Sequence, residues 1–377
     1  MKIDKYSAIL GNAIGFAEME GLTANRPLAS LPFDGKYRLI DFQLSNLANA
    51  GVRSVYGIFR GQNIRSIFDH IRSGREWGLN TLLSHYFLGF YDSATDSTLS
   101  DADYYEQILT YLRRAGSDQT IYMSCDVLCN IDLQQVIHLH NANKRNITVV
   151  YKKLPVSSIS GDNDILDVDE TDSVVGSRKV DSSSETEKMS AGIYVVNTPW
   201  LIEQMEKEAQ KEQPKKLRYL LRDLIVEDHG LAFEYTGYLC NIHSVKSYFD
   251  ANMDMLDPAK FYSLLYSNQK VYTKVKNEES TYFDPSSVVN DSQFASGSII
   301  KGNVEHSIVS RSCRVETGAK LSHTVVFPKV TIGEGATVEY AIIDKGAKIP
   351  AGVTIKGTAE QPLVISKGQE ITGDIIA

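Results

Sequence analysis

Two loops of the sequence carry residue types that phosphate chemistry uses. The first, 11–18, follows an apolar segment and holds Gly11 and Gly15, and glycines let backbone N–H groups approach an anion. The second follows the apolar segment 120–124 and contains Asp126, a carboxylate of the kind that holds a divalent cation. The first loop ends with Glu18, whose charge would repel a polyphosphate. The two loops therefore offer only part of what a polyphosphate site requires.

The elements that must position these loops alternate between strand and helix over residues 5–260. The expected strands are 7–10, 52–59, 120–124, 146–151 and 189–196. The expected helices are 40–50, 63–72, 100–114, 133–144, 200–211, 217–227 and 245–255. This order predicts a mostly parallel sheet covered on both faces, in which ligands bind beyond the carboxyl ends of the strands. The loops after Leu10 and after Ser124 should therefore flank the pocket.

A tract rich in Ser, Asp and Glu interrupts this pattern at 157–188. Within it, 164–169 and 173–177 have the composition of a β-ribbon, and 182–185 is typical of an exposed loop. We interpret the tract as an insertion in the α/β domain.

From about residue 285 aliphatic residues recur at a solenoid period. Two steps of six and one of five make a repeat of 17 residues. Three registers keep it: Val304, Leu321, Val338 and Ile355; Val309, Val326 and Ile343; Val315, Ile332 and Ile349. The six-residue step also predicts inward-facing Val288, Phe294 and Ile300, and Gly-Ala pairs at 318, 335 and 346 suit tight corners. The pattern predicts a left-handed parallel β-helix, because a sandwich would alternate with period two.

These patterns divide the chain into an α/β domain at 1–258, a linker at 259–284 and a β-helix at 285–377.

The net charge of −8 and the absence of a long basic run argue against nucleic-acid binding. The sequence has no apolar run long enough to span a membrane and no signal peptide, and the spacing of its four cysteines fits neither a zinc site nor a disulfide framework. We expect a cytoplasmic protein.

Several segments resemble glucose-1-phosphate adenylyltransferase (ADP-glucose pyrophosphorylase), whose fold is a Rossmann-like nucleotide-diphospho-sugar transferase domain followed by a β-helix. The matching segments are 22–42, 44–52, 70–77, 190–195 and 248–254, and the likeness runs in order along the whole chain. It implies an enzyme that makes ADP-glucose from ATP and glucose 1-phosphate with Mg²⁺.

The same resemblance shows where the chain departs from a working enzyme. The family's glycine-rich loop continues into an arginine that stabilises the phosphates, and Glu18 stands there. The family holds Mg²⁺ between two aspartates. The first is retained as Asp126, which we interpret as vestigial, and the second is replaced by Asn241, whose neutral amide is a poor ligand for a hard cation. The chain alone should therefore require no cofactor.

The sugar-phosphate site is also incomplete by this resemblance. A lysine in the first half of the family's sequences falls on Leu28, and Lys179 is an uncertain substitute for a second lysine. Ser190 and Gly192 match the sugar-side strand, although they could be plain strand residues.

Three cations remain as candidates for an effector site. The resemblance places Arg26 and Arg38, with Lys36 beside them, at a pocket between the two domains that binds phosphorylated sugar metabolites. Surface ion pairs would account for these residues equally well.

These departures resemble those of the non-catalytic family members of some Gram-positive bacteria. Such members pair with a catalytic adenylyltransferase subunit, which carries Mg²⁺, in a heterotetramer for glycogen biosynthesis. The resemblance therefore implies a regulatory subunit, which could also self-associate without its partner. A weakly active adenylyltransferase is the alternative. Acyl transfer by the β-helix would have only His306 and His323 as candidates, 17 residues apart on one edge.

Overall fold

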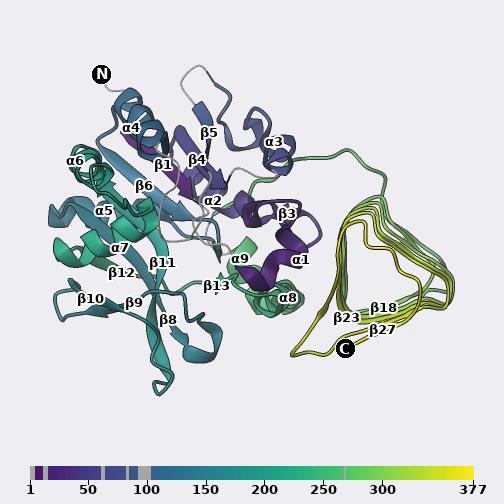
Figure 1. The fold of residues 1–377 in the computed structure, drawn as a ribbon. Coiled ribbons are helices and arrows are strands. Elements are labelled where there is room, and N and C mark those ends of the chain that lie inside the picture. Colours follow the sequence, from purple (N-terminus) through teal and green to yellow (C-terminus); the bar gives the residue numbers. More distant parts are fainter. Residues whose placement is uncertain (1–4, 12–15, 61–63, 82–84, 92–102, 267–268) are drawn as a thin grey trace.

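The computed structural model describes residues 5–11, 16–60, 64–81, 85–91, 103–266 and 269–377. Over these residues the chain forms an α/β domain and a β-helix that stand side by side (Figure 1). Among the described helices, none combines the length and the apolar character needed to cross a membrane.

A nine-stranded mixed sheet is the framework of the α/β domain. Its strands are β1 (Tyr6–Gly11), β4 (Ser54–Arg60), β5 (His85–Tyr91), β6 (Gln119–Ser124), β8 (Ile147–Pro155), β9 (Ile165–Val168), β10 (Val174–Arg178), β11 (Thr186–Asn197) and β12 (Leu231–Glu234). Strands β6, β1, β4 and β5 are neighbours in this order and run parallel. Strand β11 then pairs antiparallel with both β6 and β8. The parallel centre brings the carboxyl ends of β1 and β6 together, as the sequence predicts.

Each of the expected helices is present, and they cover both faces of the sheet. They are α2 (Leu39–Asn49), α3 (Arg65–Ile71), α4 (Asp103–Ala115), α5 (Leu133–Asn143), α6 (Thr198–Ala209), α7 (Leu217–Glu227) and α8 (Val245–Met253). The structure adds α1 (Glu20–Thr23), α9 (Pro258–Leu265) and short 3-10 turns at η1 (Ala17–Met19), η2 (Leu28–Ser30), η3 (Arg75–Trp77), η4 (Val156–Ser158) and η5 (Asp254–Leu256).

Alternation along β1 shows how the sheet builds two cores. Ala8 and Leu10 pack with α2, α3 and α5, whereas Ile9 packs on the opposite face with α4, α6 and α7. Successive side chains of a strand point to opposite faces, so a fully buried central strand reads as a continuous apolar run.

Short antiparallel ribbons complete the domain. The predicted ribbon in the inserted tract is confirmed, because β9 and β10 pair antiparallel. A second ribbon joins β7 (Val127–Cys129) to β13 (Leu239–Asn241), and a third joins β2 (Pro32–Phe33) to β3 (Tyr37–Arg38). In the second ribbon Asn241 faces Val127, so it lies beside the turn that contains Asp126.

The C-terminal domain is the left-handed parallel β-helix that the repeat predicts, and Figure 1 shows its triangular outline. Its strands are β14 (Tyr282–Phe283), β15 (Val289–Asn290), β16 (Gln293–Phe294), β17 (Ile299–Ile300), β18 (Asn303–Glu305), β19 (Ile308–Val309), β20 (Arg314–Val315), β21 (Lys320–Val326), β22 (Thr331–Ile332), β23 (Thr337–Ile343), β24 (Lys348–Ile349), β25 (Thr354–Lys356), β26 (Leu363–Ile365) and β27 (Ile375–Ile376). All three predicted registers are confirmed by parallel pairing.

The first coil corrects one prediction. Val288 is 53% exposed, and its neighbour Val289 pairs with Val304 instead and packs on the core. This coil is shorter than the later ones, since the corner between Ile300 and Val304 is tight. A Cβ on Gly302 would lie 2.4 Å from the carbonyl oxygen of Ala319, so only glycine fits there.

A third apolar core joins the two domains. It combines residues of η2, α1, α2 and α8 with the outer side chains of the β-helix, among them Leu28, Tyr248, Ile308, Phe327 and Ile342. The wall of the solenoid is therefore fixed against the α/β domain near its N-terminal segments.

Candidate functional site

Asp126 lies in the turn between β6 and β7, beyond the carboxyl end of a central strand. It is 2% exposed, although a carboxylate normally stays in water unless it is paired. The structure places it where the sequence predicts, beside the end of β1.

The protein itself supplies the partners of this carboxylate. Arg218, near the start of α7, places Nη1 3.2 Å from Oδ2 of Asp126, and the amide nitrogen of Asn241 donates to the same oxygen at 3.2 Å. The hydroxyl of Ser124 donates to Oδ1. Burial opposes ionisation of Asp126, but the charge of Arg218 and the hydrogen bonds from Ser124 and Arg218 outweigh it and hold its pKa below the usual value.

This donor set does not fit a magnesium ion. A cation needs carboxylate lone pairs, and those of Asp126 face N–H and O–H donors and a fixed positive charge. The other amide atom of Asn241, Oδ1, lies 3.1 Å from Nδ1 of His243. Across the described parts of the chain, no group of three or more His, Cys, Asp and Glu side chains could hold a metal ion.

The structure describes only part of the glycine-containing loop 11–18. Residues 12–15 are outside the described residues. Gly11 ends β1, where a Cβ would meet the Tyr122 hydroxyl at 2.6 Å, so packing within the sheet already explains this glycine. Phe16 is half-buried with its ring 6.4 Å from that of His243, and Glu18 is exposed in η1.

Leu28 is 4% exposed and belongs to the core between the domains. An apolar side chain is what this position needs for packing, and a lysine there would carry its charge into that core.

Of the sugar-side candidates, Gly192 lies beside Ser124, and Ser190 and Lys179 lie beside Asp164. Gly192 has a φ of 62°, and a Cβ on it would lie 2.9 Å from Cβ of Ser124. The hydroxyl of Ser190 accepts a hydrogen bond from the Gly192 N–H at 3.3 Å, and the Ser190 N–H donates to the carbonyl of Asp164 at 2.9 Å. Lys179 is more exposed and lies 3.8 Å from the Asp164 carboxylate, to which Arg222 of α7 also comes within 3.7 Å.

The three effector candidates have different surroundings. Arg26 is 7% exposed and pairs with Asp344 of the β-helix at 2.6 Å, so it forms a buried ion pair between the domains. Arg38 donates from Nη1 to the carbonyl of Ser66 at 2.7 Å. Lys36 is exposed and lines a cavity.

That cavity, of about 670 Å³, opens between the two domains. Its charged lining residues are Asp34, Lys36, Glu76, Lys270, Lys276 and Arg311. Arg311 is 8% exposed, and its Nε has no hydrogen-bond partner, although Glu278 lies 3.6 Å from it.

A group of cations continues from this cavity, of which sequence reasoning identified Arg38 and missed the others. We define the basic cluster as Arg38, Lys274, Lys276, Arg311 and Lys345. Burial lowers the pKa of Lys276, with the Arg311 charge adding to the effect. Burial also lowers the pKa of Lys274, with the charges of Arg72 and Arg38, and that of Lys345, with the charge of Arg38. The members come from the α/β domain, the connecting segment and the β-helix, so no single stretch of sequence indicates that they form a cluster.

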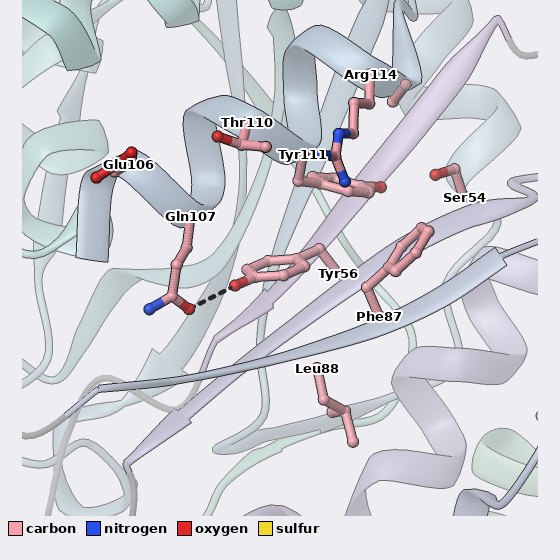
Figure 2. A pocket seen from close by; sticks show the side chains of 10 residues that line it. Ser54, Tyr56, Phe87, Leu88, Glu106, Gln107, Thr110, Tyr111 and Arg114 are labelled. Carbon is pink, nitrogen blue, oxygen red and sulfur yellow. Dashed lines mark hydrogen bonds between the residues drawn. The ribbon is translucent and has the colours of Figure 1, made fainter. Parts of the chain in front are cut away.

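A larger cavity, of about 800 Å³, lies between α4 and strands β4 and β5. Figure 2 shows the Tyr56 hydroxyl bonded to Gln107 within it, and the ring of Tyr56 stacks on Tyr111 at 5.0 Å. The described residues that line it include none of the predicted site residues. The two loops predicted to flank a pocket are likewise absent from the described lining of either cavity.

The histidines considered for acyl transfer form part of a stack on one corner of the β-helix. The rings of His306 and His323 are 4.7 Å apart, and Tyr340 lies 4.5 Å beyond His323. His306 also lies 2.5 Å from Asp291.

Comparison with known proteins identifies the two parts of the chain separately. The family described as nucleotidyl transferase matches residues 18–258, and the family described as GlmU-like, C-terminal hexapeptide, matches residues 274–362. The glycogen biosynthesis protein GlgD of Bacillus subtilis (strain 168) is 30% identical over 93% of this chain and 92% of its own length. The glucose-1-phosphate adenylyltransferase of Bacillus cytotoxicus is 27% identical over 93% of this chain and 95% of its own length, and that of Bacillus mycoides is 27% identical over 90% and 92%.

Proposed function

Since the chain belongs to the nucleotidyl transferase family, with GlgD and glucose-1-phosphate adenylyltransferase among its full-length relatives, we propose that it acts in glycogen biosynthesis as a non-catalytic, regulatory subunit of glucose-1-phosphate adenylyltransferase. Its partner would be the catalytic subunit, which carries the Mg²⁺ and joins it in a heterotetramer. The protein would work in the cytoplasm, a reducing compartment that suits its four free cysteines.

The observation that carries this proposal is the internal pairing of Asp126. Phosphoryl chemistry of this kind needs a metal ion to bridge phosphate oxygens and to neutralise developing charge. Here the carboxylate bonds to Arg218, Asn241 and Ser124. Without a metal ion, the chain would lack this source of charge stabilisation for adenylyl transfer.

The surroundings of the first loop support the same conclusion. Glu18 is exposed in η1, and its carboxylate would repel the phosphates of a nucleotide. Leu28 is fixed in the core between the domains and supplies no charge. Neither position offers the cation that a leaving pyrophosphate requires.

The basic cluster and the neighbouring cavity support an effector role. Three of its lysines have lowered pKa values because they are partly buried near other cations, and a bound polyanion would relieve that repulsion. The cavity has room for a small ligand and lies between two domains. The proposed ligand is a phosphorylated sugar, held by Lys36 and Arg38 with the lysines of the connecting segment. Arg26 is left out of this proposal because Asp344 already neutralises it.

The proposal is tested by combining the chain with a catalytic glucose-1-phosphate adenylyltransferase subunit. We expect the two to copurify, and the mixture to differ from the catalytic subunit alone in its rate of ADP-glucose formation or in its response to a hexose bisphosphate. The matched control is a variant with Lys276 and Lys345 changed to methionine, which should copurify equally well and lose the change in effector response. If the catalytic subunit neither copurifies with the chain nor changes its kinetics, the regulatory role is wrong.

A further inference from the structure

Arg218 and Asp126 form an ion pair that is hidden from solvent. Their side chains are 6% and 3% exposed, and Nη1 lies 3.2 Å from Oδ2. Nη1 is also 3.3 Å from the Ser124 hydroxyl, which donates to the other carboxylate oxygen. A buried carboxylate is costly unless it is paired and hydrogen-bonded, and this one has both kinds of partner.

We propose that the guanidinium of Arg218 stands where a divalent cation would bind Asp126, so that this site excludes divalent metal ions. The inference deepens the proposed non-catalytic role by naming the residue that closes the metal site. Arg218 is not among the residues that the sequence singles out, because its significance depends on the packing of α7 against the turn after β6.

Charge balance favours the guanidinium over a metal ion. Asp126 and Arg218 together are neutral, whereas a divalent cation added to this pair would leave two uncompensated positive charges in a buried position. The second position that could have contributed a carboxylate is Asn241, and its amide nitrogen donates to Asp126. Both oxygens of the Asp126 carboxylate therefore have partners from the protein itself.

A matched control stands one turn further along the same helix. Arg222 carries the same charge, but its Nη2 pairs with Asp223 at 2.8 Å and its Nη1 lies 3.7 Å from Asp164. Changing Arg222 therefore alters the charge of α7 without removing the hydrogen bond to Asp126.

The test measures Mn²⁺ binding to the full chain by the loss of the electron paramagnetic resonance signal of free Mn²⁺. We expect the unmodified chain to leave this signal unchanged at millimolar concentrations. The double variant R218Q with N241D removes the internal cation and adds a second carboxylate, so it should bind one Mn²⁺ per chain. The further substitution D126N should abolish that binding, and R222Q with N241D should bind none.

Two results would overturn the proposal. One is Mn²⁺ binding to the unmodified chain that disappears in D126N. The other is a folded R218Q and N241D variant that binds Mn²⁺ no better than the unmodified chain, because Arg218 would then not be what excludes the ion.

A second measurement covers the case in which that double variant does not fold. R218Q should lower the urea midpoint of unfolding, because it leaves the Asp126 charge unpaired, and adding D126N should recover part of the loss. R222Q and D126N should instead have additive effects on the midpoint. Additive effects of R218Q and D126N would overturn the pairing. Both measurements use the chain alone, so their failure is distinguishable from a failure to regulate the catalytic subunit.

Discussion

Arg26 places one guanidinium nitrogen 2.7 and 2.6 Å from the two carboxylate oxygens of Asp344, although 318 residues separate them. The pair is buried and connects the N-terminal segment to the β-helix directly after β23, with the guanidinium 5.7 Å from the ring of Phe327. Arg26 therefore helps to hold the two domains together.

The first prediction concerns this pair. Arg26→Gln leaves the Asp344 carboxylate buried without its partner, so we expect a loss of about 3–5 kcal/mol in the free energy of unfolding. Lys207→Gln is the control, because its pairing with Glu203 is exposed on both sides and should contribute no more than about 0.5 kcal/mol. Urea denaturation measures both, and an Arg26→Gln chain as stable as the unmodified one would show that the pair contributes nothing.

The second prediction is a pH dependence caused by Asp34, which lines the cavity between the domains. Burial raises its pKa from 3.8 to about 7, against the opposing effect of Lys36. Between these two pH values the folded chain binds more protons than the unfolded chain, so stability falls as the pH rises through this window. A shift of this size corresponds to at most about 4 kcal/mol.

Asp34→Asn should remove this contribution to the pH dependence. Asparagine tolerates the backbone at this position, where φ is 49°. We expect the difference in stability between the variant and the unmodified chain to favour the variant more at pH 8 than at pH 5. Exposed Glu360→Gln should show no such difference, and equal pH profiles for the Asp34→Asn variant and the unmodified chain would contradict the assignment.

The third prediction concerns Gly192, which lies at a bulge of β11 where the pairing with β8 shifts register between Ser190 and Ile193. Gly192→Ala should destabilise the chain by about 1–2 kcal/mol from the backbone alone, because φ is 62° there. The clash of the new Cβ with Ser124 should add to this loss. Gly161→Ala is the matched control, since no atom lies within 4 Å of its Cβ position. Thermal unfolding that ranks the two variants equally would show that the bulge does not require glycine.

The fourth prediction separates stability from binding in the basic cluster. Lys345→Met removes a cation whose pKa is lowered by burial and by Arg38, so the chain should become slightly more stable, by at most ~0.5 kcal/mol. The same variant should lose most of the increase in melting temperature that a hexose bisphosphate gives the unmodified chain. A variant that keeps the full increase would exclude Lys345 from the ligand site.

The fold could be predicted from the sequence where aliphatic residues recur at a short, regular spacing. The spacing of Val309, Val326 and Ile343 predicts the β-helix, because each coil must bury one side chain per face. The period fails at Val288, since the first coil is shortened at the Gly302 corner. Strand β5 was not predicted, as its sequence His85–Tyr91 lacks the alternation of a half-buried strand.

The candidate site was less accessible because its partners are distant in sequence. Asp126 could be identified from the family resemblance, at the end of a predicted strand, but its neutralisation depends on Arg218, which lies 92 residues away. For Arg26 the sequence allowed either an effector role or a surface ion pair. In the structure Arg26 forms an ion pair with Asp344, and this pair is buried. The basic cluster needs four separate stretches of sequence to meet, and the packing of the two domains brings them together.

The most direct test of the central claim is the formation of ADP-glucose by the purified chain alone, supplied with ATP, glucose 1-phosphate and Mg²⁺. The internal pairing of Asp126 predicts a rate equal to that of the reaction without protein, and the same rate for Asp126→Asn. Turnover by the unmodified chain that the Asp126→Asn variant loses would contradict the claim and establish a working adenylyltransferase.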